Sequence, residues 1–132
     1  MSVPGVVTVP WKDDVDAIIV DFFSGEMMAE SIFNVIYGDV NPSGKLPVTI
    51  PNIENEQNMT DSQFPGVNRT AVYSEHLLTG YRWYDAHNVI PAYPFGHGMS
   101  YTKFSYDNIQ VRNRTVSCAI SNFGEYAGKE IA

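Results

Sequence analysis

The stretch from Tyr93 to Phe104 constrains the fold of this chain more than any other. It reads Tyr-Pro-Phe-Gly-His-Gly-Met-Ser-Tyr-Thr-Lys-Phe, so aromatic rings, glycines and a proline crowd into one short segment. Pro94 fixes its own φ, while Gly96 and Gly98 can adopt backbone angles that other residues avoid. The rings supply large apolar area for burial. This segment is therefore predicted to be a rigid junction that packs one domain against the next.

Length and charge narrow the possible classes of protein. The chain has 132 residues, the length of one domain, but its pattern changes midway from a strand and helix to aromatic, β-rich sequence. We therefore expect a fragment that joins pieces of two domains.

The net charge is −7 and no basic cluster is present, which argues against nucleic acid as a partner. No apolar run approaches the roughly 20 residues that span a bilayer, so no membrane partner is expected.

A single cysteine, Cys118, limits the covalent and metal chemistry of the chain. No disulfide can form within the chain, and no cysteine-based zinc site can be assembled. Cys118 is expected to be a small buried apolar residue.

Three asparagines, Asn58, Asn68 and Asn113, are each followed by threonine two positions later and fit the N-glycosylation pattern. Asn41 is excluded because Pro42 follows it. The pattern favours a secreted protein or one of a secretory or lysosomal compartment. Chance matches in a polar surface are the alternative, because the pattern is short.

The first third of the chain predicts a strand followed by a helix. The apolar core at residues 17–20, within 15–23, suits a strand covered on both faces. A helix is predicted over 26–37, with Ser24 as N-cap and Gly38 at its end. Its apolar residues recur at helical spacing: Met28, Ile32, Val35 and Ile36. A further short strand is expected at residues 6–9, followed by a turn at residues 10–14.

The remaining sequence predicts turns, a loop and extended segments. Asn41-Pro-Ser-Gly44 suits a type I turn, and residues 46–50 alternate as an edge strand containing Pro47. The polar residues 52–72 predict an exposed loop. Extended segments are expected at the following ranges, the last of them after a turn at 112–114: 80–84, 101–111 and 115–120.

Three motifs, in order, resemble the late part of glycoside hydrolase family 3, the β-glucosidase and β-xylosidase family. They are Asn41-Pro-Ser-Gly-Lys-Leu-Pro47, Gly80-Tyr-Arg-Trp-Tyr-Asp85 and the segment from Tyr93 to Phe104. The resemblance implies an α/β fold class, namely the tail of an α/β sandwich domain and the first strands of a fibronectin type III-like β-sandwich. Residues 1–80 would belong to the α/β sandwich domain, 81–98 to an interdomain linker, and 99–132 to the truncated fibronectin type III-like domain.

The resemblance also implies a reaction. A whole enzyme of this family would remove terminal β-linked glucose or xylose from oligosaccharides or glycosides with retention, through a covalent glycosyl-enzyme. The nucleophilic aspartate of the family lies in an N-terminal barrel domain, and the acid/base residue lies upstream of the matched region. The chain alone is expected to be inactive, to need the missing barrel as partner, and to hold no catalytic carboxylate, cofactor or metal. The alternative is a non-catalytic module that binds carbohydrate or protein.

Asp21 and Glu26 are the first two candidates for the substrate side of the site. Both lie near the carboxyl end of the expected strand, where ligands bind in open α/β sheets. The alternative is that Asp21 solvates a strand end and Glu26 stabilises a helix start. The family often has Pro-Gly-Gln-Glu-Gly-Gly at this turn, where this chain has Ser24-Gly-Glu-Met-Met-Ala29, so that Met27 replaces the acidic residue.

Arg82 and Trp83 are the other two candidates. Arg82 can stack on a ring or pair with Asp85, and aromatic faces of this kind bind sugars; packing between domains is the alternative. His97 has no partner at metal-ligand spacing in His76 or His87, so a structural hydrogen bond is expected for it.

Overall fold

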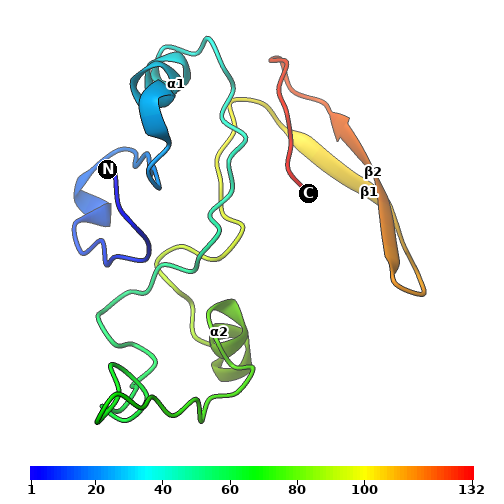
Figure 1. Cartoon of the computed structure of the whole chain (residues 1–132). Coiled ribbons are helices and arrows are strands. Elements are labelled where there is room, and N and C mark those ends of the chain that lie inside the picture. The colour runs from blue at the N-terminus through cyan, green and yellow to red at the C-terminus, as the bar shows by residue number, and fades with distance from the viewer. The chain divides into compact units, whose positions relative to one another are not determined.

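Figure 1 shows the computed structural model, which describes all 132 residues. These residues divide into two compact units. The first unit contains Met1–Ser24 and Leu46–His97, and the second contains Gly25–Lys45 and Gly98–Ala132. Each unit is thus built from two stretches that are distant in the sequence. The elements are η1 (Lys12–Asp14), η2 (Gly25–Met27), α1 (Met28–Ile36), α2 (Tyr81–His87), β1 (Phe104–Arg112) and β2 (Thr115–Asn122). No helix has the length and apolar character needed to cross a membrane.

The strand predicted at residues 15–23 of the first unit does not form. Only Asp21 is paired there, because its N–H donates to the Met1 carbonyl and its carbonyl accepts from Val3, each at 2.9 Å. Ile19 remains 37% exposed. A strand covered on both faces needs neighbouring strands, and the first three residues are the only stretch that pairs with this one.

The prediction for residues 6–14 was partly wrong. No strand forms at residues 6–9, although Val9 is buried. The turn predicted at 10–14 is present as η1, in which Lys12 N–H donates to the Val9 carbonyl at 3.0 Å.

Residues 46–50 pair with the segment before His97 at two points instead of forming a strand. Leu46 N–H donates to the His97 carbonyl at 2.8 Å, and Ile50 N–H donates to the Tyr93 carbonyl at 2.9 Å. Pro47 and Pro94 have no N–H to donate, so a continuous ladder cannot form between these two points. Ile50 is nevertheless buried, which makes this pairing part of the small core of the first unit.

The polar loop predicted at residues 52–72 is confirmed. The segment consists of turns and contains neither helix nor strand. Asn55 illustrates how it is held, because its side chain accepts from Met59 N–H at 2.8 Å and donates to the Met59 carbonyl at 3.0 Å. Such local side-chain bonds replace regular backbone pairing in turns.

The sequence prediction was wrong at residues 80–84, which begin helix α2 instead of an extended segment. Gly80 takes φ 54°, and Asn88 ends the helix at φ 54° in the left-handed region. The aromatic residues suggested a strand, but β-propensity depends on context and is overridden by burial. Here the helix buries Tyr84, which is 4% exposed.

Helix α1 in the second unit follows the predicted apolar spacing but begins differently. Met28, Ile32 and Val35 are half-buried, whereas Ile36, the fourth residue of the predicted apolar spacing, is 58% exposed. Ser24 does not cap it; Met27 occupies that position without a side-chain hydrogen bond. The predicted end is confirmed, because Gly38 adopts φ 82° just beyond the helix and donates its N–H to the Val35 carbonyl.

The predicted pair of strands near the C-terminus is confirmed as an antiparallel hairpin. β1 and β2 pair from Phe104↔Asn122 to Arg112↔Thr115, with an irregularity between Asp107 and Gln110. Asn113, at φ 55°, lies in the short turn between them. Figure 1 shows β1 and β2 lying side by side along their length.

The chain exposes far more surface than a protein of its mass normally does. Its accessible surface is 10276 Å², whereas a folded monomer of 14.7 kDa exposes about 7,000 Å². The buried apolar residues are Val9, Ile50 and Tyr84. Cys118, predicted to be buried, is exposed on β2, because no further layer covers the hairpin.

Candidate functional site

Asp21, the first sequence candidate, is held firmly by its surroundings in the first unit. Its side chain is buried, Oδ1 accepts from Ser24 N–H at 2.9 Å, and Oδ2 accepts from the Ser2 hydroxyl at 3.2 Å. The hydrogen bond from Ser24 is the main reason that the pKa of Asp21 lies below its ordinary value. The carboxylate therefore remains ionised and fixes the turn between residues 21 and 24.

Glu26, the second candidate, belongs to the second unit. It lies in η2 with an exposed side chain that makes no hydrogen bond or ion pair. Its position just before α1 places a negative charge near the positive end of that helix, which is favourable. Because the side chain of Glu26 has no partner, no contact decides between stabilisation of the helix start and a position on the substrate side.

Arg82 and Trp83, the remaining candidates, lie on α2 in a group of rings. The Arg82 guanidinium is 5.0 Å from the centre of the Tyr81 ring, and Tyr81 is 5.1 Å from Phe95 between ring centres. Arg82 forms no ion pair with Asp85. The Trp83 ring stacks on His87 at 4.4 Å. A cation over a ring beside exposed aromatic faces can bind the apolar face of a sugar or pack against protein.

The aromatic group of the first unit consists of two ring pairs, Tyr81 with Phe95 and Trp83 with His87, and Arg82 lies over Tyr81. Tyr81 and Trp83 are two positions apart on α2, so the two pairs lie on different sides of that helix. The sequence indicated its members near Gly80-Tyr-Arg-Trp-Tyr-Asp85, but helical spacing is what places Trp83 and His87 one turn apart. Asp21 shares this unit but has no hydrogen bond with Arg82 or Trp83.

Glu56 and Tyr84 form an anchor that the sequence did not reveal. The buried Tyr84 hydroxyl donates to Glu56 Oε2 at 2.7 Å. The same carboxylate accepts from Asn52 N–H at 3.0 Å and from Asn52 Nδ2 at 2.8 Å. Glu56 therefore ties the exposed loop to α2. Its sequence neighbourhood is uniformly polar, so no pattern singles it out.

The anchor should make the stability of the first unit depend on pH at both extremes. Burial alone would raise the pKa of Glu56, but the hydrogen bonds from Asn52 and Tyr84 lower it, and the pKa lies below the ordinary value of 4.5. The pKa of Tyr84 lies above its ordinary value of 10.0, mainly because the residue is buried and also because its hydroxyl bonds to Glu56. Stabilisation by Glu56 is thus complete above pH 4.5 and is lost as the pH falls from there through the folded pKa. Stabilisation by Tyr84 is complete below pH 10.0 and is lost as the pH rises from there.

Urea unfolding followed by tryptophan fluorescence at a series of pH values measures this dependence, because Trp11 and Trp83 both lie in the first unit. Tyr84→Phe is expected to reduce the loss at alkaline pH, and Glu56→Gln the loss at acidic pH. If both variants keep the wild-type pH profile, the anchor does not contribute to it.

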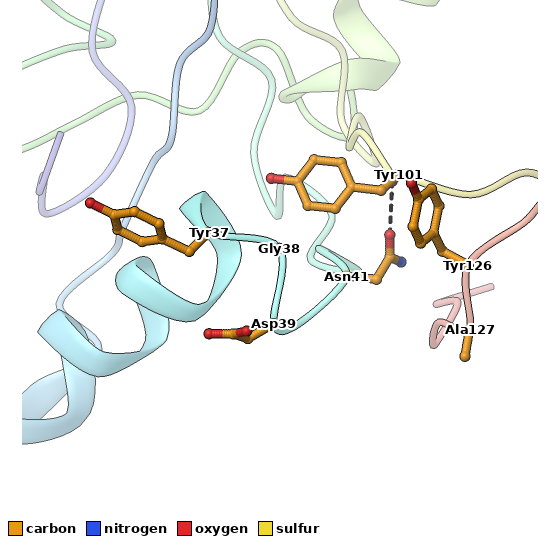
Figure 2. Close-up of a pocket in the computed structure, with 7 residues that line it drawn as sticks. All are labelled: Tyr37, Gly38, Asp39, Asn41, Tyr101, Tyr126 and Ala127. Carbon is orange, nitrogen blue, oxygen red and sulfur yellow. Dashed lines mark hydrogen bonds between the residues drawn. The ribbon is translucent and has the colours of Figure 1, made fainter.

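An open hollow of about 540 Å³ lies in the second unit beyond the end of α1. Figure 2 shows the rings of Tyr37, Tyr101 and Tyr126 around it, with the Asp39 carboxylate at its edge. Tyr101 is fixed by its own contacts, because its hydroxyl donates to the Val35 carbonyl at 2.7 Å. The hollow therefore combines exposed rings with one carboxylate.

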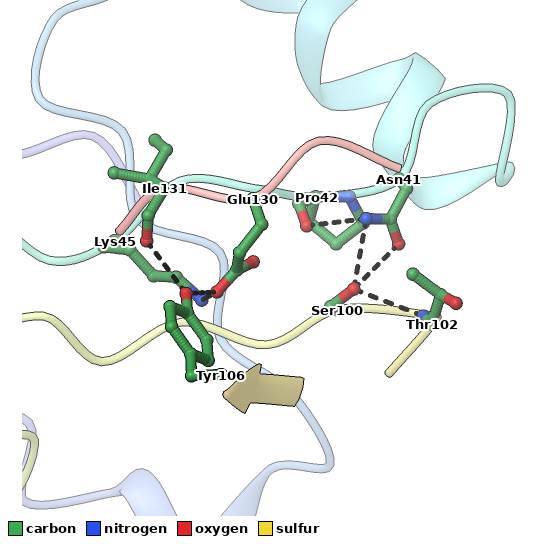
Figure 3. Close-up of polar contacts among 8 residues, drawn as sticks. All are labelled: Asn41, Pro42, Lys45, Ser100, Thr102, Tyr106, Glu130 and Ile131. Carbon is green, nitrogen blue, oxygen red and sulfur yellow. Dashed lines mark hydrogen bonds and ion pairs between the residues drawn. The ribbon is translucent and has the colours of Figure 1, made fainter. Parts of the chain in front are cut away.

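The Asn41 side chain makes hydrogen bonds with residues on one side of this hollow. Its Oδ1 accepts from Tyr101 N–H at 2.8 Å (Figure 2). Oδ1 also accepts from the Ser100 hydroxyl at 3.2 Å, while Nδ2 donates to the Pro42 carbonyl at 3.1 Å (Figure 3). A Cβ added to Gly128 would lie 2.5 Å from Asn41 Nδ2, so the C-terminal segment approaches closely here. The type I turn predicted for Asn41-Pro-Ser-Gly44 does not form, because residues 41–44 make no turn; the Asn41 side chain instead holds Ser100 and Tyr101.

A second polar cluster of this unit fixes Glu130. Lys45 Nζ lies 3.1 Å from Glu130 Oε1, and the Tyr106 hydroxyl donates to the same oxygen at 2.7 Å (Figure 3). The bond from Tyr106 lowers the pKa of Glu130 and raises that of Tyr106 to about 12. Glu130 Oε2 is buried without a hydrogen-bond partner. The C-terminal segment is thereby tied to both Lys45 and β1.

The charges of these carboxylates limit the chemistry that they can perform. Asp21, Glu56 and Glu130 all have a pKa below the ordinary value. A general acid for glycoside cleavage carries a raised pKa instead. The three groups are suited to accept hydrogen bonds. The described residues also contain no group of three metal-ligating side chains.

His97 does not make the side-chain hydrogen bond that was expected. Its ring lies against Tyr93, with 5.3 Å between ring centres. Its backbone instead joins the pairing with Leu46.

Comparison with known proteins identifies the family. Residues 1–101 match the glycosyl hydrolase family 3 C-terminal domain. Thermostable beta-glucosidase B of Acetivibrio thermocellus is 39% identical over 133 residues, covering 95% of this chain and 18% of that protein. Beta-glucosidase BoGH3A of Bacteroides ovatus is 37% identical, with 95% of this chain and 18% of that protein covered.

Solved structures agree with the sequence matches. DesR, a beta-glucosidase from Streptomyces venezuelae in complex with D-glucose, superposes with a TM-score of 0.84 at 38% identity, covering 93% of this chain and 17% of that one. Beta-glucosidase 3B from Thermotoga neapolitana, in complex with glycerol, gives a TM-score of 0.80 at 37% identity, with 94% and 18% covered. The chain thus spans less than a fifth of the length of these relatives. It belongs to glycosyl hydrolase family 3, through the C-terminal domain of that family.

Proposed function

We propose that this chain is a C-terminal part of a retaining β-glycosidase that removes terminal β-linked glucose or xylose. The observation that carries the proposal is the match of 95% of the chain to beta-glucosidases at 39% and 37% identity. The large exposed apolar surface supports it, because such a surface needs further protein to cover it. The carboxylates required for glycoside cleavage would come from the rest of the enzyme.

The proposal includes a finer assignment of the fold. Residues 1–80 would close an α/β sandwich domain, 81–98 would link it to the next domain, and 99–132 would begin a fibronectin type III-like sandwich. The hairpin of β1 and β2 supports the last part, because its strands are exposed on both faces as incomplete pieces of a sheet. We also propose Asp21, Glu26, Arg82 and Trp83 as residues on the substrate side of the complete site.

Two measurements test the hydrolase proposal. The first is the coding sequence upstream of the Met1 codon, where we expect an in-frame barrel domain with a candidate aspartate nucleophile. The second is hydrolysis of an aryl β-glucoside by residues 1–132 and by the extended protein. We expect no product from the chain alone, and the β-anomer of glucose as first product from the extended enzyme. A stop codon and start signal directly before Met1 would contradict the proposal for this product.

A binding module is the second candidate, and the observation in its favour is the exposed ring pair of Tyr81 and Phe95 with the Arg82 guanidinium over Tyr81. Titration of the chain with glucose, xylose and soluble β-glucans distinguishes the two. Saturable binding that is lost in Arg82→Ala but kept in Arg69→Ala, an exposed arginine of the same unit, would support the module. Absence of binding by the chain alone would favour the enzyme part.

We further propose that the protein passes through a secretory or lysosomal compartment. The three asparagine-containing acceptor patterns support this location.

A further inference from the structure

Asn58, Asn68 and Asn113 have a common environment in the structure. All three are exposed, and all lie in the left-handed region at φ 54°, 51° and 55°. None of their carboxamides makes a hydrogen bond with the protein. Other asparagines are engaged: Asn41, Asn52, Asn55 and Asn122. The three acceptor asparagines can therefore carry a large substituent without breaking an intramolecular bond.

Asn68 and Asn113 lie at the tips of tight turns. Asn68 and Arg69 are the central residues of a turn closed by Val67 N–H to the Thr70 carbonyl at 2.9 Å and by the reverse bond at 3.0 Å. Asn113 lies in the turn between β1 and β2, next to the Arg112↔Thr115 pair. At such tips the backbone is fixed by its own pairing while the asparagine side chain faces solvent.

Asn68 and Asn113 differ from Asn58 in whether the hydroxyl of the threonine two positions later is already hydrogen-bonded. An acceptor site requires the hydroxyl two positions after the asparagine. Thr60 Oγ1 shares a hydrogen bond of 2.9 Å with Ser62 and donates to Gln63 Oε1 at 3.0 Å. The hydroxyls of Thr70 and Thr115 make no hydrogen bond in the structure. Asn58 is therefore the least favourable of the three acceptors.

We propose that Asn68 and Asn113 are N-glycosylation sites of this protein; the inference rests on the proposed secretory location and not on the hydrolase activity. The oligosaccharide donor would be a lipid-linked oligosaccharyl diphosphate. The asparagine Nδ2 forms a bond to the anomeric carbon C1, the bond from C1 to the diphosphate oxygen breaks, and the amide nitrogen loses one proton. The lipid diphosphate is the leaving group, and no oxidant or reductant is needed.

A glycan on Asn113 would have a physical effect on the hairpin. Val111 and Val116, on either side of the turn, are 71% and 67% exposed. N-linked glycans are bulky and solubilising. In residues 1–132 alone, a glycan at this tip would restrict access to these two valines.

Expression of residues 1–132 through the secretory pathway of a eukaryotic cell tests the proposal. Enzymatic removal of glycans in heavy-oxygen water converts each occupied asparagine to a labelled aspartate, which peptide mass mapping then locates. We expect most molecules to be labelled at positions 68 and 113, and several-fold less labelling at position 58. Failure of this test would not be confused with failure of the hydrolase proposal, because the number of attached glycans does not depend on glycoside hydrolysis.

Variants sharpen this test. Asn68→Gln and Asn113→Gln should each remove one glycan, and Thr115→Ala should remove the glycan at position 113 while Thr115→Ser keeps it. Asn88→Gln is the matched control, because Asn88 is exposed at φ 54° but lacks a threonine two positions later. Absence of label at both 68 and 113, or label only at 58, would overturn the proposal.

Discussion

Replacing Tyr84 with alanine is expected to lower the free energy of unfolding of the first unit by about 3–5 kcal/mol. Tyr84 is 4% exposed and is the largest of the three buried apolar side chains in the chain. Removing a buried aromatic ring loses its transfer free energy and leaves a cavity. Because native domains are stable by only about 5–15 kcal/mol, most of the stability of this unit would be lost.

The hydroxyl and the ring of Tyr84 can be separated experimentally. Tyr84→Phe keeps the ring but removes the 2.7 Å bond to Glu56. A hydrogen bond to a charged group contributes about 1.5–3 kcal/mol, so this variant should be intermediate. The loop at Asn52 should also loosen, since Glu56 would keep only the bonds from that residue.

Urea unfolding monitored by tryptophan fluorescence measures these changes. Trp83 is the informative probe, because its ring lies 5.2 Å from that of Tyr84 between centres. Tyr73→Ala is the matched control, since Tyr73 belongs to the same unit and is 74% exposed. An unchanged midpoint for Tyr84→Ala would show that Tyr84 is not part of the core of this unit.

The elements that could be predicted from sequence are those fixed by local chemistry. The β1–β2 hairpin follows from extended runs on either side of Asn113, which tolerates the left-handed backbone of a turn. α1 follows from its apolar spacing and from Gly38, and the loop at 52–72 from its polar composition. The family could also be recognised, because its motifs lie in the right order around Pro42, Gly80 and Pro94.

The elements that could not be predicted depend on distant partners. Tyr84 reads as a strand residue in an aromatic run, yet burial against the loop that contains Glu56 favours the helix. The apolar run at Ala17–Val20 reads as a central strand, yet only Met1–Val3 pairs beside it. The candidate site shows the same limit, because the bonds that hold Asp21 come from Ser2 and Ser24 and leave no signature in the sequence.

Replacing Gly98 with alanine is expected to destabilise the second unit by about 1–3 kcal/mol. A Cβ on Gly98 would collide with the carbonyl oxygen of Gly44 and lie 2.8 Å from Lys45 Cδ. The side chain of Lys45 can move, but the Gly44 backbone cannot do so without shifting its neighbours. The cost is therefore steric, and it falls on the contact between two segments that are distant in sequence.

The collision should weaken the bonds that hold these segments together. Moving residue 98 away from residue 44 strains the nearby bond from Tyr101 N–H to Asn41 Oδ1, which is 2.8 Å long. It also strains the ion pair of Lys45 with Glu130. Since each 1.4 kcal/mol is a factor of ten, exchange of the Tyr101 amide hydrogen should become about 5- to 150-fold faster.

Hydrogen exchange measured by NMR tests this prediction, with the amides of the first unit as an internal reference. Gly44→Ala is the matched control, because Gly44 lies on the other side of the same contact, but a Cβ added to it would meet no atom within 4 Å. It should leave the Tyr101 amide as protected as in the wild type. If Gly98→Ala exchanges no faster than Gly44→Ala, the close approach at Gly98 does not determine the stability of this unit, and its glycine reflects another requirement of the local backbone.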